Sequence, residues 1–357
     1  MVPVRNVYYM LAYAFRALES AGYADLATED FDSAADLLAA ILARGINMQV
    51  RRGLAHAYVP LEEVTASPRG KIDVGTTVKG ATLATRRLAC SRDEFTANAY
   101  LNRILKTAGL LLLREPIDKA RARELRRALA FLDGVDPLDP RRIEWGQRYD
   151  RGTATYRMLV GVSRMAVEGA LQSSEAGRSR LERFSDGQQM SALYEHFLLG
   201  YFRREHGDAV SAGAPYVPWA LDGDEAGMLP VMRTDVTLRG KEAAKGRTLI
   251  IDAKYYSHNT QTRFDRRTVH SGNLYQMFAY VKNEEERLAR LGEPHEVSGL
   301  VLYAKTDDEL QPEGTWGMSG NSIGVGTVDL GAELPTIAAT LDGIVGRYFG
   351  VGIADVG

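Results

Sequence analysis

Two runs of sequence decide the fold: Pro230-Val-Met-Arg-Thr-Asp235-Val-Thr-Leu238 and Leu249-Ile-Ile-Asp252-Ala-Lys254-Tyr-Tyr256. A polar segment, residues 239–246, separates them, and this order is typical of a strand, a turn and a second strand. Side chains alternate between the two faces of a strand, so Asp252 and Lys254 share one face. A turn centred near residues 243–244 would place Asp235 opposite Asp252, with their Cβ atoms roughly 5 Å apart.

Two facing carboxylates repel each other unless a cation lies between them, and carboxylate oxygens are ligands that suit Mg²⁺. Lys254 beside that ion would orient or help to deprotonate a water, or stabilise charge on a phosphate. This set is what metal-assisted hydrolysis of a phosphodiester requires. An Asp and a Lys two residues apart are usually a solvated ion pair. Here the flanking residues are apolar, and charges in such a strand are costly without a function.

Three further residues are candidates for the same site. Glu195 precedes the hairpin on a predicted helix and is either a third metal-binding carboxylate or an ordinary surface residue. Gln276 and Tyr280 lie four residues apart on the next predicted helix and therefore share one face. We predict that they hold the lysine or a phosphate.

The pattern along the chain predicts a mixed α/β protein with two domains, at residues 1–180 and 181–357. The first is helical with a small β-rich module at about residues 53–90, and the second is an α/β domain around the hairpin. Expected helices are 5–18, 33–50, 97–113, 118–132 and 156–171, then 190–205, 273–291 and 334–349. Residues 172–189 are polar, lack periodicity and are the expected linker.

Composition excludes several classes of protein. The 357 residues carry 44 basic and 46 acidic side chains, a formal charge of −2, so the chain is not a general polycation. A single cysteine, Cys90, excludes an internal disulfide and any site with several cysteine ligands. No apolar run is long enough to span a bilayer, and the N-terminus lacks the pattern of a secretion signal, so a cytoplasmic protein with no membrane partner is expected. No Gly-x-x-x-x-Gly-Lys-Ser/Thr loop occurs, so we expect no nucleotide hydrolysis by a P-loop.

The sequence resembles a known family. Asp235, then Asp252-x-Lys254, then Gln276-x-x-x-Tyr280 is similar to the PD-(D/E)xK nuclease superfamily. The wider sequence resembles the McrC family, the nuclease subunits of the 5-methylcytosine-specific McrBC restriction system. The matching runs are Val2-Pro-Val-Arg-Asn-Val-Tyr-Tyr-Met-Leu-Ala-Tyr-Ala-Phe15, Arg52-Gly-Leu54, Pro68-Arg-Gly-Lys-Ile-Asp73, Ile251-Asp-Ala-Lys-Tyr-Tyr256 and Asn273-Leu-Tyr-Gln-Met277. One departure is visible: Thr234 precedes Asp235 where the superfamily name has proline.

The resemblance implies a restriction-endonuclease-like second domain that cuts double-stranded, methylated DNA with Mg²⁺. It also implies dependence on an McrB-like AAA+ partner. GTP would bind to that partner and not to this chain, and the N-terminal part of this chain would stimulate the partner's GTPase. Asp235, Asp252 and Lys254 carry over as the catalytic set. Arg263, Arg266 and Arg267 are the expected DNA contacts, because they lie between Lys254 and Gln276 in the sequence.

The β-rich module is the expected site of partner contact, with Arg69, Lys71 and Lys79 as candidate residues. A basic run at residues 119–127 has three interpretations: a solvated face, a DNA contact or a partner contact. Two rival functions also stay open. One is a PD-(D/E)xK nuclease of repair or transposition with no GTPase partner, and the other is a non-catalytic activator of a GTPase.

Overall fold

The computed structural model describes residues 2–15, 31–80, 82–175, 188–223, 227–256, 260–263 and 266–350, with 18, 23, 26 and 29 as single residues. For residues 82–83, 172–175, 188–189, 260–263 and 266–267 it describes the backbone alone. The chain divides into two compact units, residues 1–20 with 183–357 and residues 21–182. Most of the expected linker at 172–189 lies outside the described residues.

The predicted first domain is corrected at its beginning, because the first 20 residues belong to the unit that contains the hairpin. Helix α1 (Val4–Ala14) packs on α7 (Gln188–Glu205), where Tyr9 and Tyr13 contact the ring of Phe197. Gly200 permits the close approach, since a Cβ there would lie 2.1 Å from the carbonyl oxygen of Tyr13. The pattern of an amphipathic helix predicts a buried face, but it does not predict which unit of the protein packs against that face.

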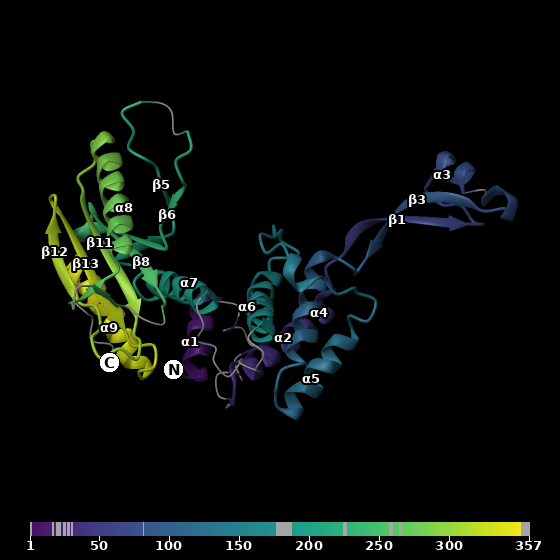
Figure 1. Cartoon of the computed structure of the whole chain (residues 1–357), viewed down its shortest axis with the longest axis horizontal. Coiled ribbons are helices and arrows are strands. Elements are labelled where there is room, and N and C mark those ends of the chain that lie inside the picture. The colour runs from purple at the N-terminus through teal and green to yellow at the C-terminus, as the bar shows by residue number, and fades with distance from the viewer. Residues whose placement is uncertain are drawn as a thin grey trace. The chain divides into compact units, whose positions relative to one another are not determined.

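The unit of residues 21–182 is a group of helices that carries a β-rich arm (Figure 1). Its helices are α2 (Ala34–Arg52), α4 (Tyr100–Leu112), α5 (Lys119–Ala130) and α6 (Tyr156–Glu175), with a short 3₁₀ turn at Pro140–Arg142. Helix α2 begins at Ser33, whose hydroxyl accepts the Asp36 N–H, and its predicted apolar stripe, including Leu38 and Ile41, is fully buried. Capping of its first turn and burial of residues 34–43 on all sides together fix this helix.

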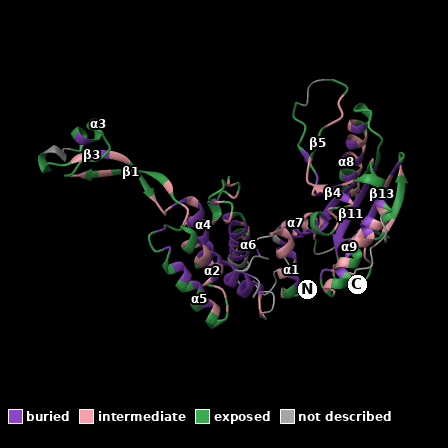
Figure 2. Cartoon of the chain, turned by 180° about the vertical axis from the view of Figure 1, so that it is seen from behind, coloured by how far each residue is buried: buried purple, intermediate pink, exposed green. Residues whose placement is uncertain are grey.

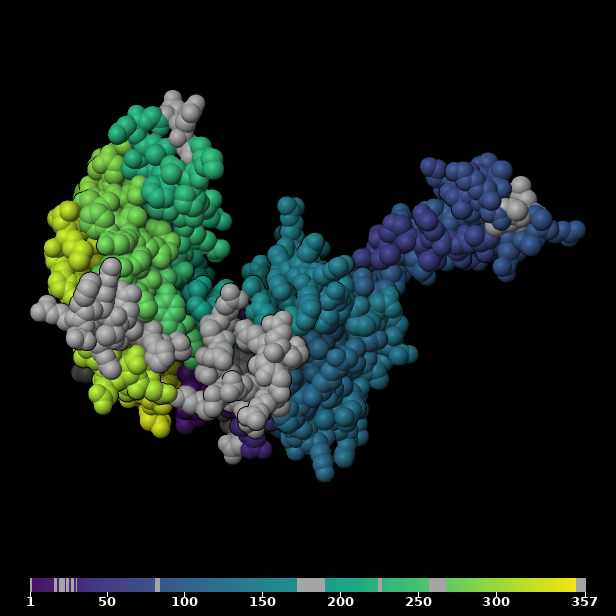
Figure 3. Space-filling view, viewed as in Figure 1, coloured from purple at the N-terminus to yellow at the C-terminus, as the bar shows by residue number. Residues whose placement is uncertain are grey.

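The arm consists of β1 (Ala57–Thr65), β2 (Lys71–Ile72) and β3 (Leu88–Thr96), which pair antiparallel in the order β1-β3-β2. Helix α3 (Val74–Lys79) and a 3₁₀ turn (Thr82–Thr85) close its far end. The predicted β-rich module is present. Within it, residues 82–85 form the turn, and β3 begins three residues later. In the space-filling view of Figure 3 the arm is a narrow projection from the helices of its unit.

The other unit is built on a six-stranded sheet in the order β12-β13-β11-β8-β7-β4. The strands are β4 (Val210–Gly213), β7 (Val236–Gly240), β8 (Arg247–Lys254), β11 (Glu296–Ala304), β12 (Gly314–Met318) and β13 (Asn321–Val328). Strands β8, β11 and β13 run parallel, and the other neighbouring pairs are antiparallel. Helices α8 (Ser271–Arg290) and α9 (Leu334–Phe349) pack against the sheet, with a 3₁₀ turn at Glu242–Ala244 between β7 and β8. The predicted mixed α/β class is confirmed.

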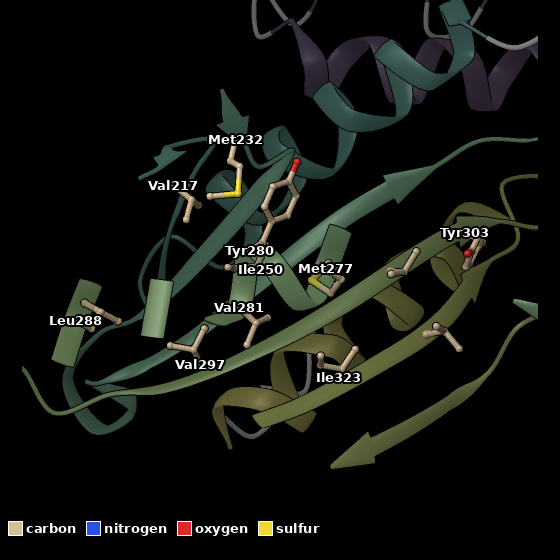
Figure 4. Packing of buried hydrophobic residues seen from close by; sticks show 12 residues of the cluster. Val217, Met232, Ile250, Met277, Tyr280, Val281, Leu288, Val297, Tyr303 and Ile323 are labelled. Carbon is tan, nitrogen blue, oxygen red and sulfur yellow. The ribbon is translucent and has the colours of Figure 1, made fainter. Parts of the chain in front are cut away.

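Helix α8 covers the face of the sheet on which Ile250 and Val301 lie (Figure 4). It approaches β11 closely at Gly299, where a Cβ would lie 2.5 Å from the sulfur of Met277. Met277 and Val281 are fully buried there. Because residues two apart on a strand share a face, Asp252 and Lys254 lie on the same side as Ile250, below the N-terminal half of α8.

Two small antiparallel ribbons complete this unit: β5 (Tyr216–Val217) with β6 (Met232–Arg233), and β9 (Thr260–Arg263) with β10 (Arg266–Val269). The run expected as one strand at 229–238 is therefore two strands, because β6 pairs with β5 and only β7 joins the large sheet. No helix among the described residues is long and apolar enough to cross a membrane.

Candidate active site

The strand register brings the two predicted carboxylates together. Val236 on β7 pairs with Ile251 on β8, and Thr237 pairs with Ile250. The next position along this register puts Asp235 beside Asp252, and the charge of Asp235 contributes to the raised pKa of Asp252. Two adjacent carboxylates repel each other when both are charged. A cation that binds both groups would offset this repulsion.

Asp252 is the most buried charged group of the site, with 3% of its side chain exposed. Burial raises its pKa to about 6, assisted by the nearby Asp235 carboxylate and opposed by the Lys254 ammonium. Lys254 Nζ lies 2.7 Å from its Oδ2. That oxygen nevertheless accepts no hydrogen bond of ordinary geometry. Asp252 Oδ2 is thus a buried acceptor with spare capacity.

Asp235 directly precedes β7, and the main chain of β8 holds its side chain in place. Its Oδ2 accepts the N–H of Ala253 at 2.8 Å. Burial raises its pKa, while this hydrogen bond and the positive charges of Lys254 and Arg233 act in the opposite direction. The backbone N–H of Ala253, which lies between Asp252 and Lys254, therefore orients the Asp235 carboxylate.

The lysine is part of a chain of contacts that the sequence predicted in outline. Lys254 Nζ donates to Gln276 Oε1 at 3.4 Å, and Gln276 Nε2 donates to Tyr280 Oη at 2.7 Å. Tyr280 Oη in turn donates to the carbonyl of Arg233 at 3.1 Å. Burial alone would lower the lysine pKa, but Asp252 outweighs it and the pKa is raised. Lys254 is thus a fixed, charged ammonium group, and α8 sets its position.

Glu195 on α7 lies close enough to this site for the charges of Asp235, Asp252 and Lys254 to shift its pKa. Its pKa is raised to about 7, chiefly by burial and next by the charge of Asp235, while the Ser191 hydroxyl, which donates to Oε1 at 3.4 Å, acts in the opposite direction. Among the residues that the structure describes, no three His, Cys, Asp or Glu side chains converge closely enough to hold a metal. Glu195 therefore stays a prediction as a metal ligand. Mg²⁺ commonly takes one or two carboxylates plus waters and substrate phosphates, and Asp235 with Asp252 fits that requirement.

Thr234 has a structural reason to replace proline. Its N–H donates to the carbonyl of Pro215 at 3.2 Å, and its hydroxyl lies 2.9 Å from that of Thr237. Proline has no N–H to give. The departure from the superfamily pattern therefore secures the chain beside β5 and leaves Asp235 in place.

Comparison with known proteins shows the family of the chain. The sequence model of the McrBC 5-methylcytosine restriction system component family matches residues 4–291. The chain belongs to the McrBC family. It is 29% identical to an Escherichia coli K12 protein, the type IV methyl-directed restriction enzyme EcoKMcrBC, over 98% of each chain.

Two similar solved structures come from Thermococcus gammatolerans. One is a half-complex of a tetradecameric assembly of McrB AAA+ hexamers with bound McrC, with a TM-score of 0.41 and 14% identity over 94% of this chain and 76% of that one. The other is an McrBC complex, with a TM-score of 0.39 and 17% identity over 57% of this chain and 59% of that one.

Several residues around the site of this McrBC-family chain were not predicted. Asn273 accepts a hydrogen bond from the hydroxyl of Tyr256 at 3.3 Å and donates to that of Tyr303 at 2.9 Å. A signal was present, because Asn273 lies one helical turn before Gln276 and Tyr256 follows Lys254 by two residues. Tyr303 is paired with Lys254 across parallel strands, which no local pattern reveals.

The residues predicted to contact DNA and those predicted to contact the partner lie outside the group around Asp252. Arg263 and Arg266 face each other across the β9–β10 ribbon, next to Arg267, between β8 and α8 in the chain. Their side chains are outside the described residues, so DNA contact stays a prediction. Arg69, Lys71 and Lys79 are all exposed on the arm. Their contact with a partner also stays a prediction.

Proposed function

We propose that this chain is the DNA-cutting subunit of a methylation-dependent restriction system, with a PD-(D/E)xK active site at Asp235, Asp252 and Lys254. One observation carries the proposal: two carboxylates lie side by side on facing strands beside a lysine that α8 holds in place. Membership of the McrBC family supports the choice of DNA as substrate. The proposed place of action is the cytoplasm.

The residues have distinct roles in the proposed reaction. Mg²⁺ would be held by Asp235 and Asp252, where it would supply charge stabilisation and a more acidic water. Lys254 is charged and fixed, so it stabilises negative charge that develops on the phosphate and orients the attacking water. Gln276 and Tyr280 position Lys254, and the carboxylates accept the proton of the water as it attacks.

We further propose that recognition and energy come from an McrB-like AAA+ GTPase that binds the arm. The sequence of this chain has no P-loop, so GTP would bind to the partner. The arm residues Arg69, Lys71 and Lys79 are exposed and available for contact. A formal charge of −2 suits a nuclease that is delivered to methylated DNA by a partner and uses local arginines to hold the strand.

The decisive experiment incubates the chain with methylated or unmethylated DNA, Mg²⁺ and GTP, with and without the AAA+ partner. We expect cleavage of methylated DNA only when the partner, GTP and Mg²⁺ are all present. Cleavage without the partner or GTP would favour a nuclease of repair or transposition. GTPase stimulation with no cleavage would favour a non-catalytic activator.

A further inference from the structure

The backbone at Arg233 lies where the chain leaves the large sheet. β6, which ends at Arg233, pairs with β5, whereas β7 begins at Val236 and pairs with β8. Met232 and Thr234 are buried, with 6% and 1% of their surface exposed, and Arg233 between them is exposed. Arg233 lies two residues before Asp235, where the chain bends between the two strands. The positive charge of Arg233 lowers the pKa of Asp235, so it acts at the site.

The main chain of Arg233 is tied to the catalytic lysine. Its carbonyl accepts the Tyr280 hydroxyl, which accepts the Gln276 amide, which in turn accepts the Lys254 ammonium. Figure 4 shows Tyr280 reaching from α8 towards Met232, the neighbour of Arg233. The backbone of Arg233 and the ammonium group of Lys254 are thus linked through the side chains of one helix, with the Asp235–Asp252 pair beside them.

The side chain of Arg233 is supported but not neutralised. Its guanidinium carbon lies 5.9 Å from the ring centre of Tyr216, its partner across the β5–β6 ribbon. That distance is within the range of a cation–π contact, and Tyr216 is itself 67% exposed. Among the residues that the structure describes, no carboxylate forms an ion pair with Arg233. A planar guanidinium with free donors is suited to bind the oxygens of a phosphate in two places at once.

We propose that Arg233, supported by Tyr216, binds a phosphate of the DNA strand that enters the active site. This subsite rests on the nuclease function proposed above, and it adds a second positively charged contact to Lys254. Lys254 acts on the phosphate that is cut, whereas Arg233 holds the strand. Loss of Arg233 should therefore weaken DNA binding more than it slows the chemical step.

The test uses the full chain with its partner and compares Arg233→Ala, Arg233→Lys and Tyr216→Leu with Arg347→Ala, an exposed arginine on α9. We expect Arg233→Ala to raise KM for DNA about tenfold with kcat changed less than threefold, and to reduce the slope of log affinity against log salt by about one. Arg233→Lys should recover part of the loss, because lysine keeps the charge but not the two-point geometry. Tyr216→Leu should raise KM about threefold.

The same substitutions in an Asp252→Asn background separate this proposal from the nuclease function, because binding is then measured without cleavage. If the unaltered complex fails to cut DNA but Arg233→Ala still loses affinity and salt dependence, the nuclease function is wrong and the phosphate site stands. If Arg233→Ala has the KM and salt slope of Arg347→Ala, the phosphate site is wrong. Thermal unfolding of each variant checks that folding is retained.

Discussion

The candidate active site around Asp252 and the arm present charged residues in opposite ways. Around Asp252 the side chains are buried, and the polar groups contact one another inside the same unit. On the arm, Arg69, Lys71 and Lys79 are exposed, and so are large apolar side chains such as Tyr58 and Phe95, at 72% and 60% (Figure 2). Exposed apolar surface of this kind is typical of a surface that another molecule covers.

The difference shows why the two regions respond differently to sequence reasoning. The site is specified by contacts within the chain, so strand register and helical spacing were enough to bring Asp235, Asp252 and Gln276 together. The proposed contact on the arm would be specified by the partner, and nothing within the chain selects among the basic residues of the arm. The comparison predicts that single changes at the site alter chemistry and leave partner contact intact, and that changes on the arm do the reverse.

Asp252→Asn should give the largest effect. It removes a charge from the carboxylate pair that would hold Mg²⁺, and a metal contributes several kcal/mol to stabilising the transition state. We expect DNA cleavage to fall on the order of a thousandfold or more, while stimulation of the partner GTPase changes less than twofold. Cleavage of methylated DNA and GTP hydrolysis are measured on the same complex.

Asp208→Asn is the matched control, because Asp208 is an exposed carboxylate in the turn between α7 and β4. It should leave both activities unchanged. Full cleavage by Asp252→Asn would remove the assignment of the active site. Loss of GTPase stimulation together with cleavage would show that the site and the arm are not separable.

Phe95→Ala on the arm should produce the reverse pattern. Phe95 stacks on His56 at 4.8 Å and contacts Tyr58 at 5.1 Å between ring centres, so it is the centre of an exposed aromatic group. Aromatic residues at the centre of an interface typically contribute about 2 kcal/mol or more to binding, which is roughly thirtyfold in affinity. We expect that loss in partner affinity, measured by titration of GTPase stimulation. Phe131→Ala, also an exposed phenylalanine, is the control.

The basic residues of the arm can be tested in the same way as Phe95. Replacing Arg69, Lys71 and Lys79 together by Glu should slow association with the partner and make binding less sensitive to salt, because exposed charges act mainly on association rate. Unaltered affinity in both arm variants would place the partner surface elsewhere on the chain.

Much of the fold was readable because it depends on local pattern. The α9 range, the β7–β8 register and the buried stripe of α2 all follow from spacing along one segment. The position of α1 was not readable, because Tyr9 and Tyr13 form their ring contacts with a helix almost 190 residues later in the chain. The split between β6 and β7 was missed for a similar reason, since it depends on pairing with β5 and on the hydrogen bond from Thr234 to Pro215.

Tyr280→Phe should have a moderate effect that tests the helix side of the site. It removes the hydroxyl that accepts from Gln276 and donates to the Arg233 carbonyl, so the groups that hold Lys254 lose their support. Residues that orient active-site groups typically contribute ten- to a hundredfold, and we expect about tenfold in kcat with little change in KM. Tyr275→Phe, an exposed tyrosine one residue before Gln276, should have no effect. Equal kcat values in the two variants would mean that Lys254 needs no such support.

Glu195→Gln should give the smallest effect, a pH-dependent change in stability. The folded-state pKa of Glu195 is about 7, above the usual value of about 4.5, because of burial and Asp235. Between these two values the folded state holds more protons than the unfolded state, so this group makes the protein less stable as pH rises from 4.5 to 7. The amide has no such titration. Without divalent ions, the variant should therefore match the wild type at pH 4.5, gain stability relative to it up to pH 7, and keep a constant advantage above.

Urea unfolding at pH 5, 6 and 8 measures this difference, with Glu286→Gln on the exposed side of α8 as the control. Adding Mg²⁺ at pH 8 then decides the role of Glu195. If Glu195 is a metal ligand, Mg²⁺ stabilises the wild type more than the variant and cancels the advantage of the amide. If Asp235 and Asp252 hold the ion without it, both proteins gain equally and the advantage of the amide persists. A difference between wild type and variant that does not vary with pH would show that Glu195 lies in a more solvated environment than its contacts indicate, and the site would then end at the two facing aspartates.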